Sequence, residues 1–427
     1  TTSVLVHLPV EPSSVATTFD GYPMAQQGHA THALTLAFTS AGTGALFGVV
    51  VITLLSGWVT QFALKFSSPE YFAVYLLTFC SFIGMGNASP FKTIVSMMLG
   101  FAFASVGMDT ISGSMRLTFG FPELVKGISF LVAVIGLFGI GELLQTMEEG
   151  LRFEGIKARI NPRDVLRALI SLPKYWLTLL RSALVGCWMG ITPGGPTAAS
   201  FMSYGLAKRF SRNKEAYGKG EPAGVIAPET ADHSAGTCAI LPMLALGVPG
   251  SATAAVMMGG LMIWGLTPGP MLFIERPDFV WGTIASMYLG NVMAVVLVLA
   301  TVPLFAAILR IPFSIIGPMI VVVCFIGAYT ISGARLDLWL GLAFGVFGYL
   351  LKKLDYPIAP LVLAMVLGDK AEDAFRQSMI FSKGSMGIFW SNGLVGTITT
   401  LALVLLFWPM IASLIKKLRA QPAEARA

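Results

Sequence analysis

Long runs of apolar residues without a single charge dominate the chain. A membrane-spanning helix needs roughly 20 apolar residues, and several of these runs are longer than that. A soluble core can hold one such run but not this many. Uncharged runs extend over residues 21–64, 71–91, 182–207, 234–274, 281–309, 311–334 and 385–415, with shorter ones at 93–108, 127–141, 338–351 and 356–368. The pattern predicts an all-α polytopic membrane protein with roughly 9–12 spans.

Composition supports the membrane class and narrows it. Of the 427 residues, 55% are hydrophobic and only 12% are charged, which is about half the charged share of an average soluble domain. The chain also contains 46 glycines and 24 prolines, many of them inside the apolar runs. A broken helix is tolerated in a bilayer only where protein or a water-filled cavity satisfies the freed backbone groups. These breaks favour a transporter or a channel over a simple membrane anchor.

The net charge of +6 matters less than where the basic residues lie. They form two loop clusters and a C-terminal cluster, which are Arg152, Lys157, Arg159, Arg163, Arg167 and Lys174; Lys208, Arg209, Arg212, Lys214 and Lys219; and Lys416, Lys417 and Arg419. Cytoplasmic loops of membrane proteins carry an excess of Lys and Arg, so we expect these segments on the cytoplasmic side. The clusters border apolar runs and have no interleaved aromatic platform, which argues against nucleic-acid binding.

The chain also predicts an internal repeat at an offset of about 240 residues. Residues 7–16 correspond to 247–256, the run from Pro69 to Cys80 to the run from Pro312 to Cys324, and residues 99–103 to 340–344. Three matches in order at a nearly constant offset are hard to produce by chance. We therefore expect two homologous repeats with re-entrant or broken helical hairpins, and a substrate site near the membrane midplane between them.

The repeat divides the chain into four predicted segments. They are a first transmembrane repeat at 1–149, a cytoplasmic linker at 150–174, a second transmembrane repeat at 175–415 and a basic cytoplasmic tail at 416–427. Residues 176–240 have no counterpart in the first repeat, and Thr1 already stands inside a Pro-rich motif, so we expect an N-terminally truncated chain. In the linker, Asn161 and Pro162 predict the N-cap and first residue of a short amphipathic helix on the cytoplasmic surface.

Three proline-containing motifs predict buried turns between helices. Residues 191–200 lie in a run that basic clusters flank on both sides and that is too short for two full spans, so a helical hairpin with its tip inside the membrane fits. Residues 246–253 lie midway in a long uncharged run, and we expect a half-helix to begin near Ser251. Residues 9–14 are the repeat counterpart of this second motif. Free N–H groups at a helix start can bind an anion.

The hydroxyl and tip residues of these motifs are the predicted substrate-binding residues, because they can donate hydrogen bonds to carboxylates. They are Ser13, Ser14, Thr192, Pro193, Gly194, Gly195, Thr197, Pro249, Gly250, Ser251 and Thr253. For a single motif, a proline kink that serves helix packing, with Ser and Thr bonded to their own helix, is the stronger interpretation. A pair of motifs related by a repeat at midplane depth favours binding.

Ionisable residues near the apolar runs are candidates for ion coupling, since carboxylates inside a membrane are costly. Glu229 and Asp232 precede His233 at the edge of a long uncharged run, and Asp232 alternatively fits a helix N-cap. Asn291 lies inside a run and can bond between helices or coordinate a cation. We predict Glu229, Asp232 and Asn291 as ion-coupling residues. We expect no metal site, because the cysteines are widely spaced within apolar runs.

Four segments closely resemble the large membrane subunit of the tripartite tricarboxylate transporters. They are Asp20-Gly21-Tyr22-Pro23-Met24-Ala25, which on generic grounds predicts a turn; the tip Pro193-Gly194-Gly195; Ala227-Pro228-Glu229; and the run from Gly247 to Val256. The likeness covers essentially the whole chain. The chain departs from the family pattern at His7 and Val10, where Asn and Gly are usual, at Asp232 and His233, where an Asn pair is usual, and at Pro196, where Gly is usual. These departures fall at the predicted site.

The resemblance implies a secondary transporter of the bacterial inner membrane, and not an enzyme. Such a transporter works with a periplasmic solute-binding protein and a small membrane subunit of about four spans. It imports tricarboxylates, dicarboxylates or aromatic acids with a Na⁺ or H⁺ gradient as the driving force, without a bound cofactor or ATP. The sequence has no Gly-x-x-x-x-Gly-Lys-Ser/Thr motif for nucleotide phosphates.

Three other function classes remain open from the residues alone. A single-component carboxylate carrier and a passive channel are both compatible with a polytopic chain, although a channel would favour rings of polar residues over buried turns. An intramembrane hydrolase using Asp232, His233 and Ser234 would need a relay in space, which adjacency in sequence does not provide. The identity of the carboxylate is left open.

Overall fold

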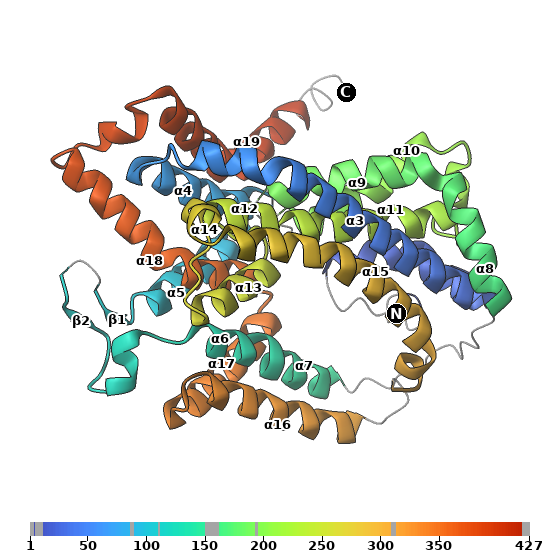
Figure 1. Cartoon of the computed structure of the whole chain (residues 1–427), viewed down its shortest axis with the longest axis horizontal. Coiled ribbons are helices and arrows are strands. Elements are labelled where there is room, and N and C mark those ends of the chain that lie inside the picture. The colour runs from blue at the N-terminus through green and yellow to red at the C-terminus, as the bar shows by residue number, and fades with distance from the viewer. Residues whose placement is uncertain are drawn as a thin grey trace. The chain divides into compact units, whose positions relative to one another are not determined.

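The computed structural model consists of helices and, in the part of the chain that it describes, one two-stranded sheet (Figure 1). It describes residue 4 and residues 12–85, 89–109, 112–149, 162–192, 195–308 and 313–420. The predicted all-α class is confirmed for these residues. Several helices begin at a proline, among them α10 (Pro196–Phe210) and α11 (Pro222–Cys238). The fixed φ of proline suits a first helical turn, and its missing N–H group is not needed there.

The chain forms two compact units, and each unit combines an early and a late part of the sequence. Unit 1 contains Thr1–Leu64 and Thr146–Ile320, and unit 2 contains Lys65–Gln145 and Val321–Ala427. Each unit therefore draws on both predicted repeats, so helices that are distant in the sequence form each core together. The repeat itself stays a prediction.

Unit 1 is built around α11. Its other elements are the 3₁₀ turn η1 (Pro12–Ser14), α2 (Val15–Met24), the π-helical turn η2 (Ala25–His29), α3 (Ala30–Ala63), α8 (Pro162–Ser171), η5 (Leu172–Tyr175), α9 (Trp176–Ile191), α10, η6 (Lys214–Ala216), α12 (Ile240–Leu246), α13 (Ala252–Ile263), α14 (Pro270–Glu275) and α15 (Pro277–Ile308). α11 packs mainly against α3, α9, α10 and α2. These contacts bury most of its surface.

Unit 2 is a second helical bundle that carries the sheet. Its elements, including two that cross the boundary between the units, are α4 (Ser68–Met85), α5 (Pro90–Ala104), β1 (Gly107–Met108), β2 (Met115–Arg116), η3 (Pro122–Lys126), α6 (Phe130–Val134), η4 (Ile135–Ile140), α7 (Gly141–Glu149), α16 (Phe313–Ser332), α17 (Arg335–Lys353), α18 (Ile358–Phe381), η7 (Met386–Trp390) and α19 (Gly393–Ala420). The strands are antiparallel, with Gly107 opposite Arg116. α18 packs against α4 and α5, and α4 also packs against α19.

Three helical stretches among the described residues are long and apolar enough to cross a membrane. They are Val15–Ala63, Phe130–Glu148 and Pro277–Thr301, and shorter apolar helices lie at Pro90–Ala104, Thr253–Ile263, Gly317–Ser332 and Gly393–Trp408. On α15, the side chains of Leu289 and Val296 are exposed. A helix that presents apolar residues outward is typical of contact with lipid. These features fit a multi-pass membrane protein, while the count of roughly 9–12 spans stays a prediction.

Glycines allow α11 to approach its neighbours closely. A methyl group at Gly44 of α3 would lie 2.2 Å from the carbonyl oxygen of Thr230. A methyl group at Gly190 of α9 would lie 2.3 Å from the carbonyl oxygen of Ala235. Small residues at such contacts let helix backbones approach one another in membrane proteins. The position of α11 is therefore defined by backbone contacts on two neighbouring helices.

Two local expectations from the sequence are wrong. The turn predicted at residues 20–25 is helical, since α2 runs to Met24 with Pro23 inside it. The chain instead turns at Gly28, whose φ of 87° glycine adopts without strain. The alternative of Asp232 as an N-cap is also wrong, because Asp232 lies well inside α11. In both cases the residue expected at a turn or at a helix start lies within a helix.

The predicted helix in the linker is confirmed. α8 begins at Pro162, as expected from the missing N–H group of proline. Leu166 and Leu169 are both exposed on it. The predicted N-cap, Asn161, lies outside the described residues. An amphipathic helix of this kind suits the surface of a membrane, and that location stays a prediction.

Candidate functional site

One face of α11 carries three ionisable side chains. Glu229, Asp232 and His233 stand three and four residues apart, so they share a helix face. The side chains of Glu229 and His233 are 14% and 47% exposed, whereas Thr230, Ala231 and most other residues of α11 are buried. Nδ1 of His233 lies 3.7 Å from Oε2 of Glu229 and 3.0 Å from the Glu229 carbonyl oxygen. The open face of α11 thus holds two carboxylates and an imidazole.

The first predicted tip joins α9 and α10 as a helical hairpin. The two helices pack side by side, and the Ser203 hydroxyl donates to Oγ of Ser182 at 2.7 Å. The same Ser203 hydroxyl lies 3.0 Å from the carbonyl oxygen of Ala227, which ties the hairpin to α11. The hairpin shape agrees with the sequence prediction. Its depth in a membrane stays a prediction.

The tip residues themselves have different surroundings. Gly195 is buried, and a methyl group there would lie 2.0 Å from the carbonyl oxygen of Met189, so the tight turn requires glycine. The Thr192 hydroxyl donates to the carbonyl oxygen of Trp188 in its own helix. Thr197 lies in the first turn of α10. The two remaining predicted tip residues, Pro193 and Gly194, lie outside the described residues.

The second predicted tip lies between α12 and α13 and contacts α9, the helix that leads into the first tip. Pro249 and Gly250 are buried there, after the left-handed Gly247 that ends α12. A methyl group at Gly250 would lie 3.1 Å from the carbonyl oxygen of Gly190 on α9 and 3.3 Å from Cβ of Ala239. Ala239 is the residue that follows α11. The second tip and the end of α9 therefore meet at the C-terminal end of α11.

Ser251 begins a half-helix, as the sequence predicts. Its side-chain oxygen accepts a hydrogen bond of 3.1 Å from the N–H group of Ala254, which makes it the N-cap of α13. Because accepting this bond uses only a lone pair of the oxygen, Ser251 keeps its hydroxyl proton for donation. Thr253 is exposed in the first turn of α13. The start of α13 thus combines N–H groups with two hydroxyl groups.

The third motif reaches the same helices through η1. This short turn contains Ser13 and Ser14 and packs against α10 and α11. Ser13 is buried. The departures from the family pattern at His7 and Val10 lie outside the described residues. The structure therefore brings the two serines to the helices that carry the first tip and the ionisable face.

Asn291 lies apart from this group in its hydrogen bonding. Its amide donates to the carbonyl oxygen of Met287 in its own helix, α15, at 2.8 Å. α15 packs against α3, where the Tyr288 hydroxyl lies 2.8 Å from Oγ1 of Thr53. The hydrogen bond of the Asn291 amide thus stays within its own helix. Its predicted role in ion coupling stays a prediction.

Asp20 is a residue whose role was not foreseen from the sequence. It is fully buried on α2, far in sequence from its partners. Its Oδ1 accepts hydrogen bonds from the N–H groups of Gly218, Gly220 and Glu221 at 2.8–2.9 Å. Its Oδ2 accepts one from the Tyr204 hydroxyl at 2.9 Å. Asp20 thus holds the loop that leads into α11.

This loop fixes where α11 starts. A methyl group at Gly224, in the first turn of α11, would lie 2.1 Å from Oδ2 of Asp20, so only glycine leaves room for the carboxylate. Burial raises the pKa of the nearby Tyr217 to about 12, so its phenol stays neutral. Three N–H donors on one oxygen of Asp20 and the Tyr204 phenol on the other satisfy the buried charge. The open face of α11 is therefore positioned from its N-terminal end by Asp20.

A family model described as the tripartite tricarboxylate transporter TctA family matches residues 1–363. The chain belongs to the TctA family. It is 34% identical over 426 residues to an uncharacterized 52.8 kDa protein in the TAR-I ttuC' 3' region of Agrobacterium vitis, covering 98% of this chain and 83% of that protein. It is 35% identical over 233 residues to an uncharacterized protein in the TAR-II ttuC' 3' region of Agrobacterium vitis, covering 54% of this chain and 96% of that protein. No solved structure matches the chain significantly.

Membership of the TctA family makes the chain a component of a tricarboxylate-type transporter. The family also supplies the sequence signal for Asp20, because the string from Asp20 to Ala25 is one that resembles the family. No generic rule of turns or periodicity points to a bond between Asp20 and a loop near residue 220. The TctA family is a transporter family, so the ionisable face of α11 is interpreted in terms of transport.

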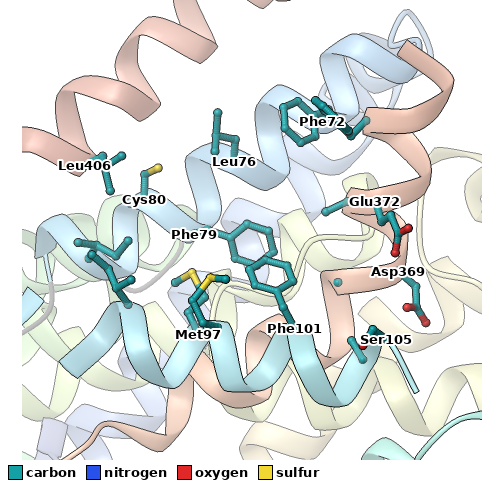
Figure 2. A pocket seen from close by; sticks show the side chains of 17 residues that line it. Phe72, Leu76, Phe79, Cys80, Met97, Phe101, Ser105, Asp369, Glu372 and Leu406 are labelled. Atoms are coloured by element: carbon teal, nitrogen blue, oxygen red, sulfur yellow. The ribbon is translucent and has the colours of Figure 1, made fainter. Parts of the chain in front are cut away.

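Unit 2 of this TctA-family protein contains a cavity of about 700 Å³ between α4, α5, α18 and α19 (Figure 2). Its walls are mostly aromatic and aliphatic side chains, such as Phe79, Phe101 and Leu406. Asp369, Glu372 and Ser105 lie at one end. The cavity was not expected from the sequence, because its walls come from residues that are hundreds of positions apart.

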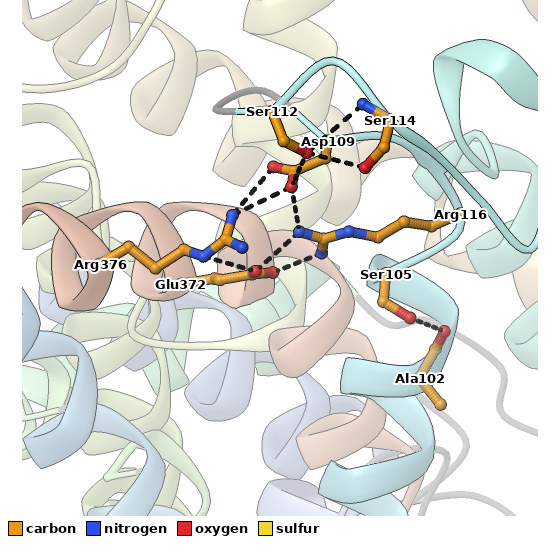
Figure 3. Close-up of polar contacts among 8 residues, drawn as sticks. All are labelled: Ala102, Ser105, Asp109, Ser112, Ser114, Arg116, Glu372 and Arg376. Carbon is orange, nitrogen blue, oxygen red and sulfur yellow. Dashed lines mark hydrogen bonds and ion pairs between the residues drawn. The ribbon is translucent and has the colours of Figure 1, made fainter.

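Beside this cavity, four charged side chains form a closed ion-pair cluster (Figure 3). Arg116 on β2 donates to both carboxylate oxygens of Glu372 on α18 at 2.9 and 3.0 Å. Asp109, which follows β1, lies 2.7 Å from Nη2 of Arg116 and 3.0 Å from Nη1 of Arg376. Nε of Arg376 lies 3.5 Å from Glu372. The hydrogen bonds to Glu372 and Asp109 raise the pKa of Arg116, so the pairs persist across the physiological pH range.

Proposed function

We propose that this TctA-family chain is the permease subunit of a binding-protein-dependent tripartite transporter of the bacterial inner membrane. It imports a small organic carboxylate, which is a tricarboxylate, a dicarboxylate or an aromatic acid, and a gradient of Na⁺ or H⁺ drives the import. A small membrane subunit and a periplasmic solute-binding protein complete the system. The observation that carries the proposal is the contact of the second tip with the end of α9 at the end of α11, whose open face bears Glu229 and Asp232.

Substrate binding would use the helix starts at these tips. The N-terminal end of a helix carries a partial positive charge and unpaired N–H groups, both of which stabilise a carboxylate. α10 and α13 both start at a tip, and Ser251 retains a hydroxyl proton while its oxygen caps α13. Thr253, Thr197, Ser13 and Ser14 are the further hydroxyl donors of this proposal, while the Thr192 hydroxyl would first have to leave the carbonyl oxygen of Trp188. A di- or tricarboxylate needs several such donors, which the two tips together supply.

Ion coupling would use the open face of α11. Two carboxylates on one helix face repel an anionic substrate, so a cation or a proton between them lowers the cost of bringing the substrate near. Glu229 and Asp232 are the groups for this role, and His233 holds an imidazole nitrogen 3.7 Å from the Glu229 carboxylate. Binding of the cation then favours binding of the acid, which is the thermodynamic linkage that coupled transport requires. Asn291 would complete the cation site only in another conformation.

The decisive experiment is uptake of labelled carboxylates into proteoliposomes that contain the full-length permease and its small subunit, with the binding protein outside. Sodium and proton gradients are imposed separately. We expect accumulation above the external concentration that requires the binding protein and one of the two gradients. Flux that only equilibrates would indicate a channel. Uptake that ignores the binding protein would indicate a single-component carrier.

Variants test the assignment of α11 in the same vesicles. Replacing Glu229 by Gln or Asp232 by Asn should reduce gradient-driven accumulation by about tenfold or more, since a coupling site loses one of its two charges. Glu275→Gln is the matched control, because Glu275 is exposed at the end of α14. Unchanged accumulation in both α11 variants would refute the coupling role while leaving the transport reaction itself intact.

A further inference from the structure

The cavity in unit 2 has the shape of a site for an amphiphile. Phe79, Met97 and Phe101 line its middle, and Leu406 closes it from α19. Its volume of about 700 Å³ is ample for part of a lipid; pockets for small ligands typically measure about 300–1,000 Å³. An apolar wall of this kind is unsuited to a di- or tricarboxylate, whose charges would lose their hydration. The occupant must therefore be largely hydrocarbon.

The polar end of the cavity is acidic. Asp369 and Glu372 of α18 lie there together with Ser105, which follows α5 (Figure 2). Glu372 already binds Arg116 and Arg376. In the described part of the chain, Asp369 has no hydrogen bond or ion pair of its own. Asp369 is thus the carboxylate at this end that a cationic group can engage.

Cationic side chains stand next to this acidic end. Arg116 and Arg376 belong to the ion-pair cluster, and their side chains are 28% and 37% exposed. A guanidinium group that is paired on one side can still offer N–H groups to a phosphate on the other. Positive and negative groups therefore lie side by side, with Asp369 toward the cavity. This arrangement is complementary to a zwitterion.

The polar end of the cavity lies where α5 ends and the chain continues into a segment with charged residues. α5 ends at Ala104, and the segment that follows it contains Asp109 and Arg116, which bind Glu372 and Arg376 on α18. Charged loops of this kind lie at the boundary between hydrocarbon and water, since charges are costly inside the bilayer. The apolar part of the cavity extends from there along α4 and α5. A lipid with its headgroup at this boundary would lie in its natural orientation.

The opposite ends of these helices are the cytoplasmic ones by charge. α17 ends at Lys352 and Lys353, and Lys416 and Lys417 lie near the end of α19. Under the positive-inside bias, both of these ends face the cytoplasm. α18 lies between α17 and α19 in the chain, so it starts on the cytoplasmic side, Asp369 lies at its middle, and Glu372 and Arg376 lie toward the other side. The headgroup would belong to the outer leaflet.

We propose that this cavity binds a phospholipid with a primary ammonium headgroup, such as a phosphatidylethanolamine. The ammonium group donates to Asp369, the phosphate accepts from Arg116 and Arg376, and an acyl chain lies between Phe79, Met97 and Leu406. A charge-assisted hydrogen bond to a carboxylate distinguishes this headgroup from choline, which has no N–H, and from glycerol, which has no positive charge. The bound lipid would bridge α4, α5, α18 and α19.

The test is native mass spectrometry of the full chain, purified in detergent and titrated with single phospholipids. Phosphatidylethanolamine should bind about tenfold more tightly than phosphatidylglycerol or phosphatidylcholine of the same acyl chains, the ratio expected for one charge-assisted hydrogen bond. Asp369→Asn should reduce this preference to within about twofold. Asp373→Asn, on the same helix but not lining the cavity, should retain it. Equal affinities in the native protein, or a preference unchanged by Asp369→Asn, would overturn the proposal.

A second variant tests the apolar half of the site without touching Asp369. Ile94 lines the far part of the cavity and is partly exposed, so Ile94→Trp should fold and fill space there. It should weaken binding of all three phospholipids alike and leave the headgroup preference unchanged. Free phosphoethanolamine should compete poorly, because it lacks the chain. If phosphoethanolamine competed at the same concentrations as the lipid, the apolar cavity would contribute nothing to the affinity, and the proposal would fail.

Discussion

Asp20 in unit 1 and Asp109 in unit 2 are both buried carboxylates, yet they are stabilised by different kinds of partner. Asp20 accepts hydrogen bonds from three backbone N–H groups and the Tyr204 phenol. Asp109 is held by the guanidinium groups of Arg116 and Arg376 and by the Ser112 hydroxyl at 2.5 Å. Neutral donors in fixed backbone positions define geometry, whereas paired charges respond to salt and to their neighbours.

This difference matches what each carboxylate holds in place. Asp20 fixes a loop whose backbone sets the start of α11, and α11 carries the proposed coupling residues Glu229 and Asp232. Asp109 fixes a two-stranded hairpin to the side of α18 through a cluster with both signs of charge. Removing the Asp20 carboxylate leaves several backbone N–H groups without an acceptor. Removing one charge from the Asp109 cluster leaves the remaining charged side chains able to pair with one another.

The largest effect is expected from removing the Asp20 carboxylate. Asp20→Ala leaves four donors without an acceptor in a fully buried place, so it should destabilise the protein by about 3–5 kcal/mol. Asp20→Asn keeps a carbonyl oxygen for the three N–H groups and should cost only about 1 kcal/mol. The apparent Tm of the purified protein ranks the two variants. Equal losses in both would mean that the charge, and not the acceptor geometry, is what matters at this position.

A smaller effect is expected where α3 and α11 touch. Gly44→Ala places a methyl group 2.2 Å from the carbonyl oxygen of Thr230, so the helices must separate, at about 1–3 kcal/mol. Gly236→Ala is the matched control, since Gly236 lies on the open face of α11 with nothing within 4 Å. It should be neutral or stabilising, because alanine favours helix over glycine. The same thermal measurement checks both, and a Gly44→Ala protein as stable as the control would contradict the close packing of α11.

The sequence predicts those elements whose signal is local. The start of α13 at Ser251 and of α8 at Pro162 follow from capping and proline rules that depend on adjacent residues only. The hairpin of α9 and α10 follows from the length of one uncharged run. The turn expected at residues 20–25 was wrong because the role of Asp20 is not local. Its carboxylate accepts hydrogen bonds from a loop about 200 positions away and not from its own backbone neighbours.

The residues of the candidate site can be picked out in the sequence, whereas their arrangement in space cannot. Glu229 and Asp232 stand out as carboxylates beside an apolar run, and helical periodicity then places them on one face. That Gly250 would contact Gly190 depends on how three helices pack, which no local pattern encodes. The cluster of Asp109, Arg116, Glu372 and Arg376 was missed for the same reason, because its members come from two distant parts of the chain.

A still smaller effect is expected at the ion-pair cluster around Asp109. Asp109→Asn removes the charge from a cluster that retains Glu372 for both arginines, so the loss of stability should be about 1–2 kcal/mol. Because the side chains of Arg116 and Arg376 are 28% and 37% exposed, ions reach the cluster from the arginine side, and the loss should shrink in part at 1 M salt, where the Debye length is about 3 Å. Asp355→Asn is the control, since Asp355 is 91% exposed and 3.8 Å from Lys92. A loss of stability that is independent of salt would mean that Asp109, like Asp20, acts through the geometry of its hydrogen bonds and not through its charge.

The smallest effect on stability is expected at Ser251, and it separates two roles of one side chain. Ser251→Ala removes the N-cap of α13 and should cost about 1 kcal/mol. Ser251→Asp restores an acceptor for the Ala254 N–H group and should recover that stability. The aspartate, however, replaces a hydroxyl donor by a negative charge at the proposed carboxylate site, so uptake should fall below that of the alanine variant.

Thermal unfolding and proteoliposome uptake of the two Ser251 variants therefore give opposite orders if Ser251 both caps α13 and faces the substrate. Thr301→Ala serves as a reference for the loss of a hydroxyl elsewhere in unit 1, since the Thr301 hydroxyl donates to the carbonyl oxygen of Leu297 in its own helix. If uptake followed stability in all three variants, Ser251 would be a cap alone. The donors for the acid would then be the N–H groups at the starts of α10 and α13, which do not depend on the Ser251 hydroxyl.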